Sequence, residues 1–172
     1  LWAPAERQLQ CACDACAFLF PGQAGGRFRR VPRDASVLHD FRFDDATWNE
    51  FRLPIELAFF VERENPQRVV AAYPSPGGAV EADVEAECWR RLIELNPVLA
   101  TVEREVEALL VHRIGASRRY YRVPIDVCFQ LVGLIRKSWR GLGGGPQVWG
   151  AIDEFFNGLD QRASRRVGGR HA

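Results

Sequence analysis

A continuous apolar run, Leu57-Ala58-Phe59-Phe60-Val61, limits the choice of fold more than any other stretch of this chain. Unbroken apolarity over this length is typical of a strand at the centre of a sheet. The turn signal Glu64-Asn65-Pro66 follows it, and residues 68–73 have the composition of a second strand. The pattern predicts a β-hairpin on which a sheet can be built.

Further strands and helices are expected around this hairpin. By their apolar patterns, strands are expected over residues 27–32, 36–43, 106–114 and 118–123. By their caps and amphipathic spacing, helices are expected over residues 44–51, 88–95, 124–140 and from Pro146 onward. Hairpin strands with helices between and after them predict an α+β fold, a mostly antiparallel sheet with three to four helices packed on one face.

The stretch that suggests chemistry is Cys11-Ala12-Cys13-Asp14-Ala15-Cys16. Cys11 and Cys13 leave the same face of an extended segment, and the C-x-x-C unit lets Cys13 and Cys16 converge on one ion. A short helix can open after Cys13, and a helix N-terminus favours thiolate over thiol. The spacing predicts a zinc knuckle in which Cys11, Cys13 and Cys16 are metal ligands.

Other interpretations of the same cysteines stay open. Leu9, Cys13, Cys16 and Phe20 also fall at helical spacing, so the thiols could simply pack against a core. A disulfide within the cluster is disfavoured by the tight spacing and the odd count. Zinc is favoured over an iron–sulfur cluster because no further pair of spaced cysteines is present.

Zinc in a structural site usually takes four ligands, so one more is needed. Cys88 and Cys128 fall in expected helices and are predicted to be core residues, whereas His39 is the best internal candidate. His112 is expected to be packed or exposed, and His171 lies in the tail. Because the chain begins with Leu rather than Met, we expect the missing ligand to precede Leu1.

The composition is that of a soluble globular protein, with a formal net charge of +1 and no apolar run long enough for a transmembrane helix. We therefore expect no nucleic-acid partner and no membrane insertion. Clustered cysteines favour a reducing compartment, and cytoplasmic localisation is expected.

The expected organisation has three parts. They are a cysteine-rich metal-binding knuckle over 1–22, truncated at its N-terminus, an α+β domain over 26–162 and a flexible tail over 163–172.

Three further motifs carry little functional weight. Residues 141–146 (GLGGGP) follow a helix and lack the Walker lysine, so they are interpreted as a helix–helix linker. Residues 118–122 (RRYYR) mix basic and aromatic side chains, as RNA-binding strands can, but the balanced net charge favours a solvated sheet face. Ser75 lacks a nucleophile elbow. No catalytic constellation emerges, and a non-catalytic protein is favoured.

Several stretches together resemble an uncharacterised family, found mainly in actinobacteria and encoded within gene clusters for high-affinity NiFe hydrogenases. They are CACDACAFLF at 11–20, GRFRRVP at 26–32, LAFF at 57–60, YPSPGGA at 73–79, NPVL at 96–99, VPID at 123–126 and LVGLIR at 131–136. Family members are expected to carry a further C-x-x-C upstream, so Cys11, Cys13 and Cys16 match the second half of a zinc-finger-like module.

The resemblance implies an accessory protein that assists assembly, maturation or partner docking of a NiFe hydrogenase. Its partner would be a hydrogenase subunit or a maturation factor. The alternative is an iron–sulfur or redox carrier that uses the cluster of Cys11, Cys13 and Cys16. A zinc enzyme with an open coordination position would instead need an acid or base such as His39 or Asp40 beside the cysteines.

Overall fold

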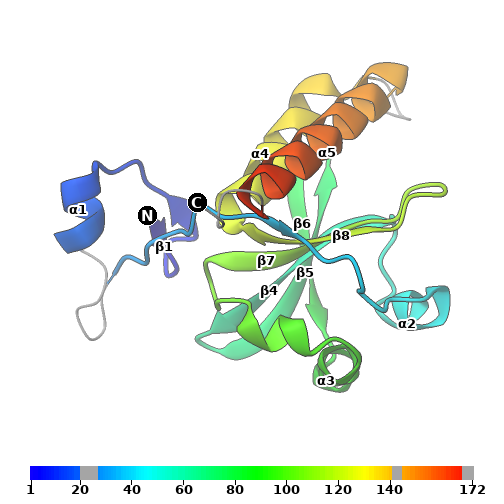
Figure 1. Ribbon diagram of the computed structural model, residues 1–172, viewed down its shortest axis with the longest axis horizontal. Coiled ribbons are helices and arrows are strands. Elements are labelled where there is room, and N and C mark those ends of the chain that lie inside the picture. Colours follow the sequence, from blue (N-terminus) through cyan, green and yellow to red (C-terminus); the bar gives the residue numbers. More distant parts are fainter. Residues whose placement is uncertain (20–26, 141–144, 168–172) are drawn as a thin grey trace.

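The computed structural model of the chain describes residues 1–19, 27–140 and 145–167. Its centre is a six-stranded antiparallel sheet with helices above and below it (Figure 1). The strands are, in spatial order, β3 (Ser36–Val37), β8 (Arg119–Pro124), β7 (Glu107–His112), β4 (Leu57–Glu64), β5 (Gln67–Ser75) and β6 (Gly78–Val84).

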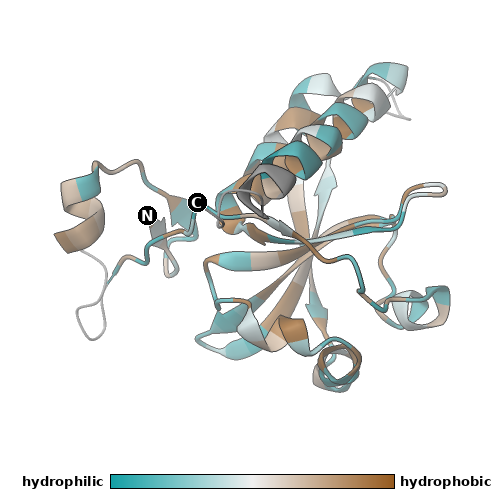
Figure 2. Ribbon diagram, in the orientation of Figure 1, coloured by the Kyte–Doolittle hydropathy of each residue, from teal (hydrophilic) through white to brown (hydrophobic). Residues whose placement is uncertain are grey.

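The predicted hairpin is confirmed and lies inside the sheet. β4 pairs with β5 on one side and with β7 on the other, so that Phe59 is the partner of both Ala72 and Leu110. Every residue of β7 is buried, because successive side chains enter opposite faces and both faces are covered. Leu109 and Leu110, for example, belong to different core clusters. Figure 2 shows the central strands as largely hydrophobic.

Two long helices cover one face of the sheet. They are α4 (Ile125–Ser138) and α5 (Gly145–Val167). The apolar spacing of the helix expected over 124–140 predicts a buried stripe of Ile125, Cys128, Val132, Ile135 and Trp139. The first four are buried on α4, whereas Trp139 follows the helix and is partly buried. On α5 the buried side chains include Val148, Ile152, Phe156 and Leu159, whereas Trp149 remains 43% exposed. The helix continues to Val167, into the segment predicted to be a flexible tail, whose last five residues lie outside the described part.

The opposite face is covered by α2 (Asp45–Glu50), α3 (Ala86–Leu95) and the 3₁₀ helix η1 (Pro97–Thr101). Asp44 caps α2 as predicted, accepting a hydrogen bond of 2.8 Å from the backbone N–H of Thr47. Trp48, Trp89 and Leu99 pack in the core on this side. The prediction that helices lie on one face is therefore wrong, because the central strands are apolar on both faces.

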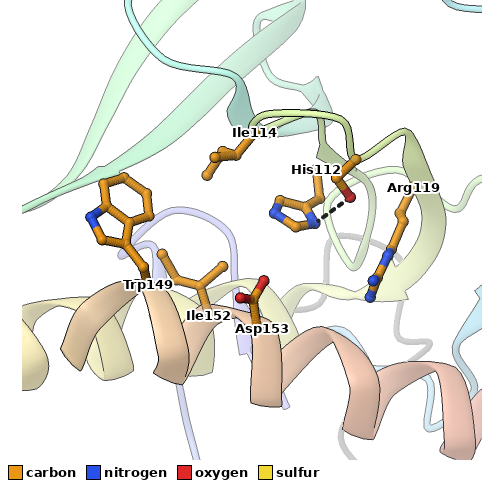
Figure 3. A pocket seen from close by; sticks show the side chains of 7 residues that line it. His112, Ile114, Arg119, Trp149, Ile152 and Asp153 are labelled. Carbon is orange, nitrogen blue, oxygen red and sulfur yellow. Dashed lines mark hydrogen bonds between the residues drawn. The ribbon is translucent and has the colours of Figure 1, made fainter. Parts of the chain in front are cut away.

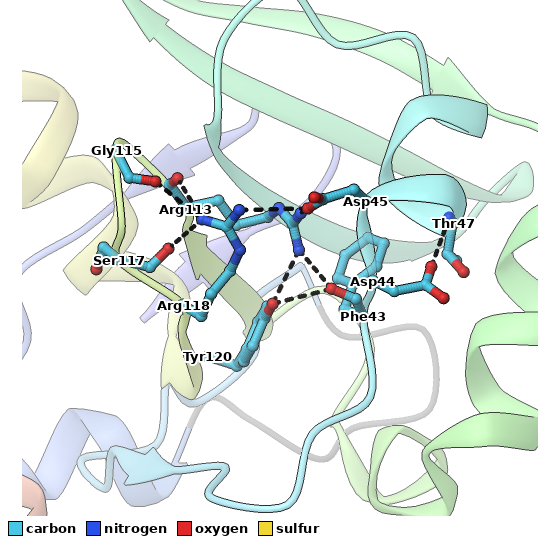
Figure 4. Close-up of polar contacts among 9 residues, drawn as sticks. All are labelled: Phe43, Asp44, Asp45, Thr47, Arg113, Gly115, Ser117, Arg118 and Tyr120. Carbon is cyan, nitrogen blue, oxygen red and sulfur yellow. Dashed lines mark hydrogen bonds and ion pairs between the residues drawn. The ribbon is translucent and has the colours of Figure 1, made fainter.

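A buried arginine joins α2 to the sheet, as Figure 4 shows. Arg113 follows β7 directly and is fully buried; its guanidinium donates to the Phe43 carbonyl and, at 3.0 Å, contacts the Tyr120 hydroxyl. It also pairs with Asp45 in the first turn of α2. The rings of Phe43 and Trp48 lie beside the same cation. Asp45 thus has a structural role as the partner of a buried guanidinium.

The N-terminal segment forms a small hairpin of β1 (Trp2–Ala3) and β2 (Gln8–Leu9), followed by α1 (Asp14–Leu19). Trp2 is fully buried in the core beneath α4 and stacks on Phe129, with ring centroids 5.7 Å apart. The hairpin is thus joined to the sheet, whereas α1 contains no buried residue and stands away from it (Figure 1).

Some predicted elements differ in extent. The strand expected over 27–32 is reduced to a single bridge between Arg29 and Trp2, and that over 36–43 to β3. The edge strand β6 was not predicted, because Pro76 and Gly77 suggested a break and none of the residues of β6 is buried. Of the described residues, no helix has the length and apolarity needed to span a membrane.

Candidate functional site

The predicted metal ligands lie at the surface, between the N-terminal hairpin and α1. Cys11 and Cys13 are exposed and Cys16 is half-buried, and all three are free thiols. The packing alternative placed these cysteines in the core, and the structure places them outside it. They are therefore accessible to an ion, an oxidant or a partner.

Cys13 and Cys16 lie close together at the start of α1. The backbone N–H and the thiol of Cys16 donate to Cys13, which lowers the pKa of the Cys13 thiol from its ordinary value. The same contact raises the pKa of Cys16, since its proton is held by Cys13. The Ala17 N–H donates to the Cys13 carbonyl at 2.9 Å and closes the first helical turn. The two thiols of the C-x-x-C unit thus lie together, and their contact favours the thiolate form of Cys13.

A full ligand set is not assembled around this pair. Among the described residues, no group of three or more His, Cys, Asp or Glu side chains is placed to hold a metal ion. Cys11 is not gathered with Cys13 and Cys16, and His39 lies exposed in a turn after β3 rather than in a strand. His171 falls outside the described residues.

The remaining two cysteines are buried, as predicted. Cys88 lies on α3 and Cys128 on α4, both in the core. Burial raises the pKa of the Cys128 thiol well above its ordinary value, which keeps it protonated and unreactive. The three cysteines at the surface and the two cysteines in the core therefore differ in their access to solvent.

An apolar end accompanies the accessible thiols. Phe18 and Leu19, the last residues of α1 that the structure describes, are 74% and 70% exposed. Figure 2 shows this end of α1 as hydrophobic. The Arg30 guanidinium lies 5.2 Å from the Phe18 ring centroid, and Arg33 pairs with Asp14 at 3.0 Å. The helix thus presents two large apolar side chains within a polar and charged surrounding.

A second site lies beside α5 and was not predicted. A pocket of about 270 Å³ opens between the end of β7, the β7–β8 turn and α5 (Figure 3). Its lining residues are His112, Ile114, Ser117, Arg119, Trp149, Ile152 and Asp153. From the sequence, His112 is expected only to be packed or exposed, and Trp149 falls in the last expected helix, so no sequence signal links the two residues.

His112 is the buried polar group of this pocket. Its ring stacks on Phe156, with centroids 4.2 Å apart and planes 4° from parallel, and its Nδ1 lies 3.1 Å from Ser117 Oγ. Burial lowers the pKa of His112 from 6.5 to about 4, and the nearby Arg119 guanidinium acts in the same direction. The imidazole is therefore neutral at physiological pH.

The basic and aromatic stretch on β8 is built into the fold. Tyr120 and Tyr121 are both buried, on opposite faces of the sheet, and so offer no stacking surface for bases. Arg119 pairs with Asp160, and Arg122 with Glu107. The arginines of the predicted solvated face are thus partly exposed and also paired with carboxylates.

The fold and the site together define a class of protein. It is an α+β domain, with its sheet covered on both faces, that carries a C-x-x-C thiol pair at its surface. Within that class, the chain belongs to a family of unknown function (DUF5947), whose model matches residues 1–163. This confirms the predicted membership in an uncharacterised family. No curated protein and no solved structure matches the chain significantly.

Proposed function

We propose that this chain is a non-catalytic, zinc-binding accessory protein, with Cys11, Cys13 and Cys16 as metal ligands and α1 as the docking element. One observation supports this best: the accessible thiols are separated from the core and lie on a helix that buries none of its residues. Binding of a ligand and a partner would explain why the chain has a segment that contributes so little to the fold.

The coordination chemistry is compatible with the described positions. Cys13 and Cys16 already approach each other, and zinc binds thiolate sulfurs at about 2.3 Å. Cys11 is two residues from Cys13 in an irregular segment, so their Cα atoms are within about 7 Å of each other. A rearrangement of residues 10–13 would bring the third sulfur to the ion, and a fourth ligand would complete the set.

The partner is proposed to be a protein. The exposed Phe18 and Leu19 side chains would supply the apolar contact, and the arginines around them the polar rim. The resemblance to a family encoded with NiFe hydrogenases suggests a hydrogenase subunit or a maturation factor in the cytoplasm. This assignment of the partner depends on the resemblance alone.

The test is elemental analysis and a visible spectrum of protein purified anaerobically. One zinc ion per chain is expected in the wild type, with loss of the metal in Cys13→Ser and Cys16→Ser. Cys88→Ala is the matched control, because it removes a buried thiol and leaves the surface thiols intact. A metal-free wild type, or retention of zinc by Cys13→Ser, would contradict the zinc proposal.

The partner has its own test, co-purification of hydrogenase components with the tagged chain from native cells. Phe18→Ser should abolish it while zinc stays bound. Failure of the wild type to recover any hydrogenase component would refute the partner and leave the zinc result standing.

An iron–sulfur or redox carrier is the second candidate. It is favoured by the contact between Cys13 and Cys16, because a lowered thiol pKa beside a second thiol suits both cluster ligation and reversible disulfide formation. The same preparation separates the two proposals. Iron with sulfide and absorption in the visible range would replace the zinc proposal with the cluster-carrier proposal.

A further inference from the structure

The pocket beside α5 has the features of a preformed binding site, independent of the cysteines. His112 is 3% exposed, and its ring is fixed by Phe156 on one face and by Ser117 at Nδ1. Figure 3 shows the other ring nitrogen, Nε2, directed into the pocket. A polar atom that faces a cavity, on a side chain that is nearly buried and held in one orientation, is arranged for a hydrogen-bonding ligand.

The charges around the pocket favour a cation. Arg119 is already engaged by Asn157 Oδ1 at 3.1 Å and by Asp160 at 3.4 Å, and Asp160 also accepts from the Tyr121 hydroxyl at 2.7 Å. Asp153 is exposed at the rim and forms no ion pair with any residue in the described part of the chain. The one guanidinium of the lining is thus engaged by groups outside the pocket, whereas the one carboxylate of the lining, that of Asp153, is available to a ligand.

The remaining walls are apolar and aromatic. Ile114 and Ile152 line the interior, and Trp149 presents an indole ring that is 43% exposed (Figure 3). An exposed tryptophan on an otherwise well-packed helix is typical of a contact surface for an apolar group or a cation. The volume of about 270 Å³ limits the occupant to a small molecule.

We propose that this pocket binds a small organic amine, with its apolar body against Trp149, Ile114 and Ile152 and its ammonium group between Asp153 and His112 Nε2. In this arrangement the Nδ1–H of His112 donates to Ser117 Oγ, which leaves Nε2 as the acceptor. The lowered pKa of His112 supports this, because a protonated ring could not accept.

The test is a titration of the full chain followed by two-dimensional ¹H–¹⁵N NMR, with three probes that share one phenethyl-type body. The probes are phenethylamine, phenethyl alcohol and hydrocinnamate. Phenethylamine is expected to shift the amides of the β7–β8 turn and the first turns of α5, and to bind more tightly than the other two. Equal or tighter binding of the alcohol or the carboxylate would overturn the proposal, as would the absence of shifts at these amides.

Two variants test whether the carboxylate of Asp153 contacts the ammonium group of the ligand. Asp153→Asn should weaken phenethylamine binding about threefold to fivefold, the size expected of a solvent-accessible ion pair, and leave phenethyl alcohol binding unchanged. Glu154→Gln is the matched control, since Glu154 is exposed on the same helix but does not line the pocket. An equal loss in Glu154→Gln, or no loss in Asp153→Asn, would overturn the role given to Asp153.

Discussion

Strand β7 and helix α1 are both six residues long, yet all of β7 is buried and none of α1 is. β7 pairs with a strand on each side and is covered on both faces, so each of its side chains contributes to the core. α1 contributes almost nothing to the core, and its two large apolar residues face solvent. The difference indicates that the sheet domain determines stability, whereas α1 adds little to it, as the proposal of α1 as a docking element requires.

The hairpin of β1 and β2 lies between these extremes. Trp2 enters the core, and its Nε1 approaches the Glu105 carboxylate at 3.5 Å. Glu105 also accepts from Arg63 at 3.0 Å and from the Glu64 N–H at 2.9 Å. Its φ of 67° lies in the left-handed region, which costs a non-glycine residue about 1–2 kcal/mol, so these contacts must hold it there. The ion pair of Arg63 and Glu105 thus lies at the junction, and the contact from Trp2 Nε1 connects the hairpin to it.

The largest effect is expected from Glu105→Ala. The substitution removes the closer partner of the buried Arg63 guanidinium, which keeps only its longer contact of 3.5 Å to Glu81 among the described residues, and should lower the free energy of unfolding by about 3–5 kcal/mol. Urea denaturation followed by circular dichroism measures the change. Glu103→Ala is the control, because Glu103 is exposed nearby and should change stability by no more than about 0.5 kcal/mol.

The opposite face gives a second comparison. Arg113→Ala removes a fully buried side chain together with its contacts to Phe43, Tyr120 and Asp45, and should cost about 3 kcal/mol. Arg118→Ala removes a half-exposed arginine that pairs with the same Asp45, and should cost at most about 1 kcal/mol. Equal losses in the two variants would show that the ion pair, rather than burial, determines the stability of this face.

His112 makes the sheet domain sensitive to acid. The unfolded chain takes up the proton near pH 6.5 and the folded chain only near 4, so the stabilisation is complete above pH 6.5 and is lost as the pH falls through this range. Between neutral pH and about pH 5 the loss should be about 2 kcal/mol. Three charges modulate it: Arg119 on β8 lowers the pKa, while Asp153 and Asp160 on α5 raise it.

The control for this effect is His112→Phe, which keeps a flat ring against Phe156 and removes the titrating group. Carboxylates elsewhere titrate in both proteins, so the difference between wild type and variant isolates His112. If both proteins lose stability equally between neutral pH and about pH 5, burial of His112 does not carry this pH dependence.

The sequence predicted the hairpin of β4 and β5 and the helix capped by Asp44 because each rests on local signals, a turn or a cap, next to an apolar pattern. The prediction that the helices lie on one face of the sheet was wrong. The unbroken apolar run of β4 already required cover on both faces, whereas an antiparallel sheet commonly has one face exposed to solvent, which favoured helices on one face. β6 was missed because an exposed edge strand lacks an apolar pattern.

The two candidate sites differ in the same way. Cys13 and Cys16 are three residues apart, so their contact follows from local spacing. The pocket joins His112 and Ser117, at the β7–β8 turn, to Trp149 and Asp153 on α5. Only the packing of that helix against the sheet brings them together, and no pattern within either segment reports that packing.

The smallest effect on stability, and the sharpest test of the comparison, is expected from Phe18→Ser with Leu19→Ser. Because both side chains are already largely exposed, the pair should change the free energy of unfolding by no more than about 0.5 kcal/mol. Leu110→Ala in β7 is the contrasting variant and should cost about 2–5 kcal/mol, through lost burial and the cavity it leaves. A loss above about 1 kcal/mol in the α1 variant would mean that α1 packs on the domain in solution, and the apolar end would then belong to the core rather than to a partner.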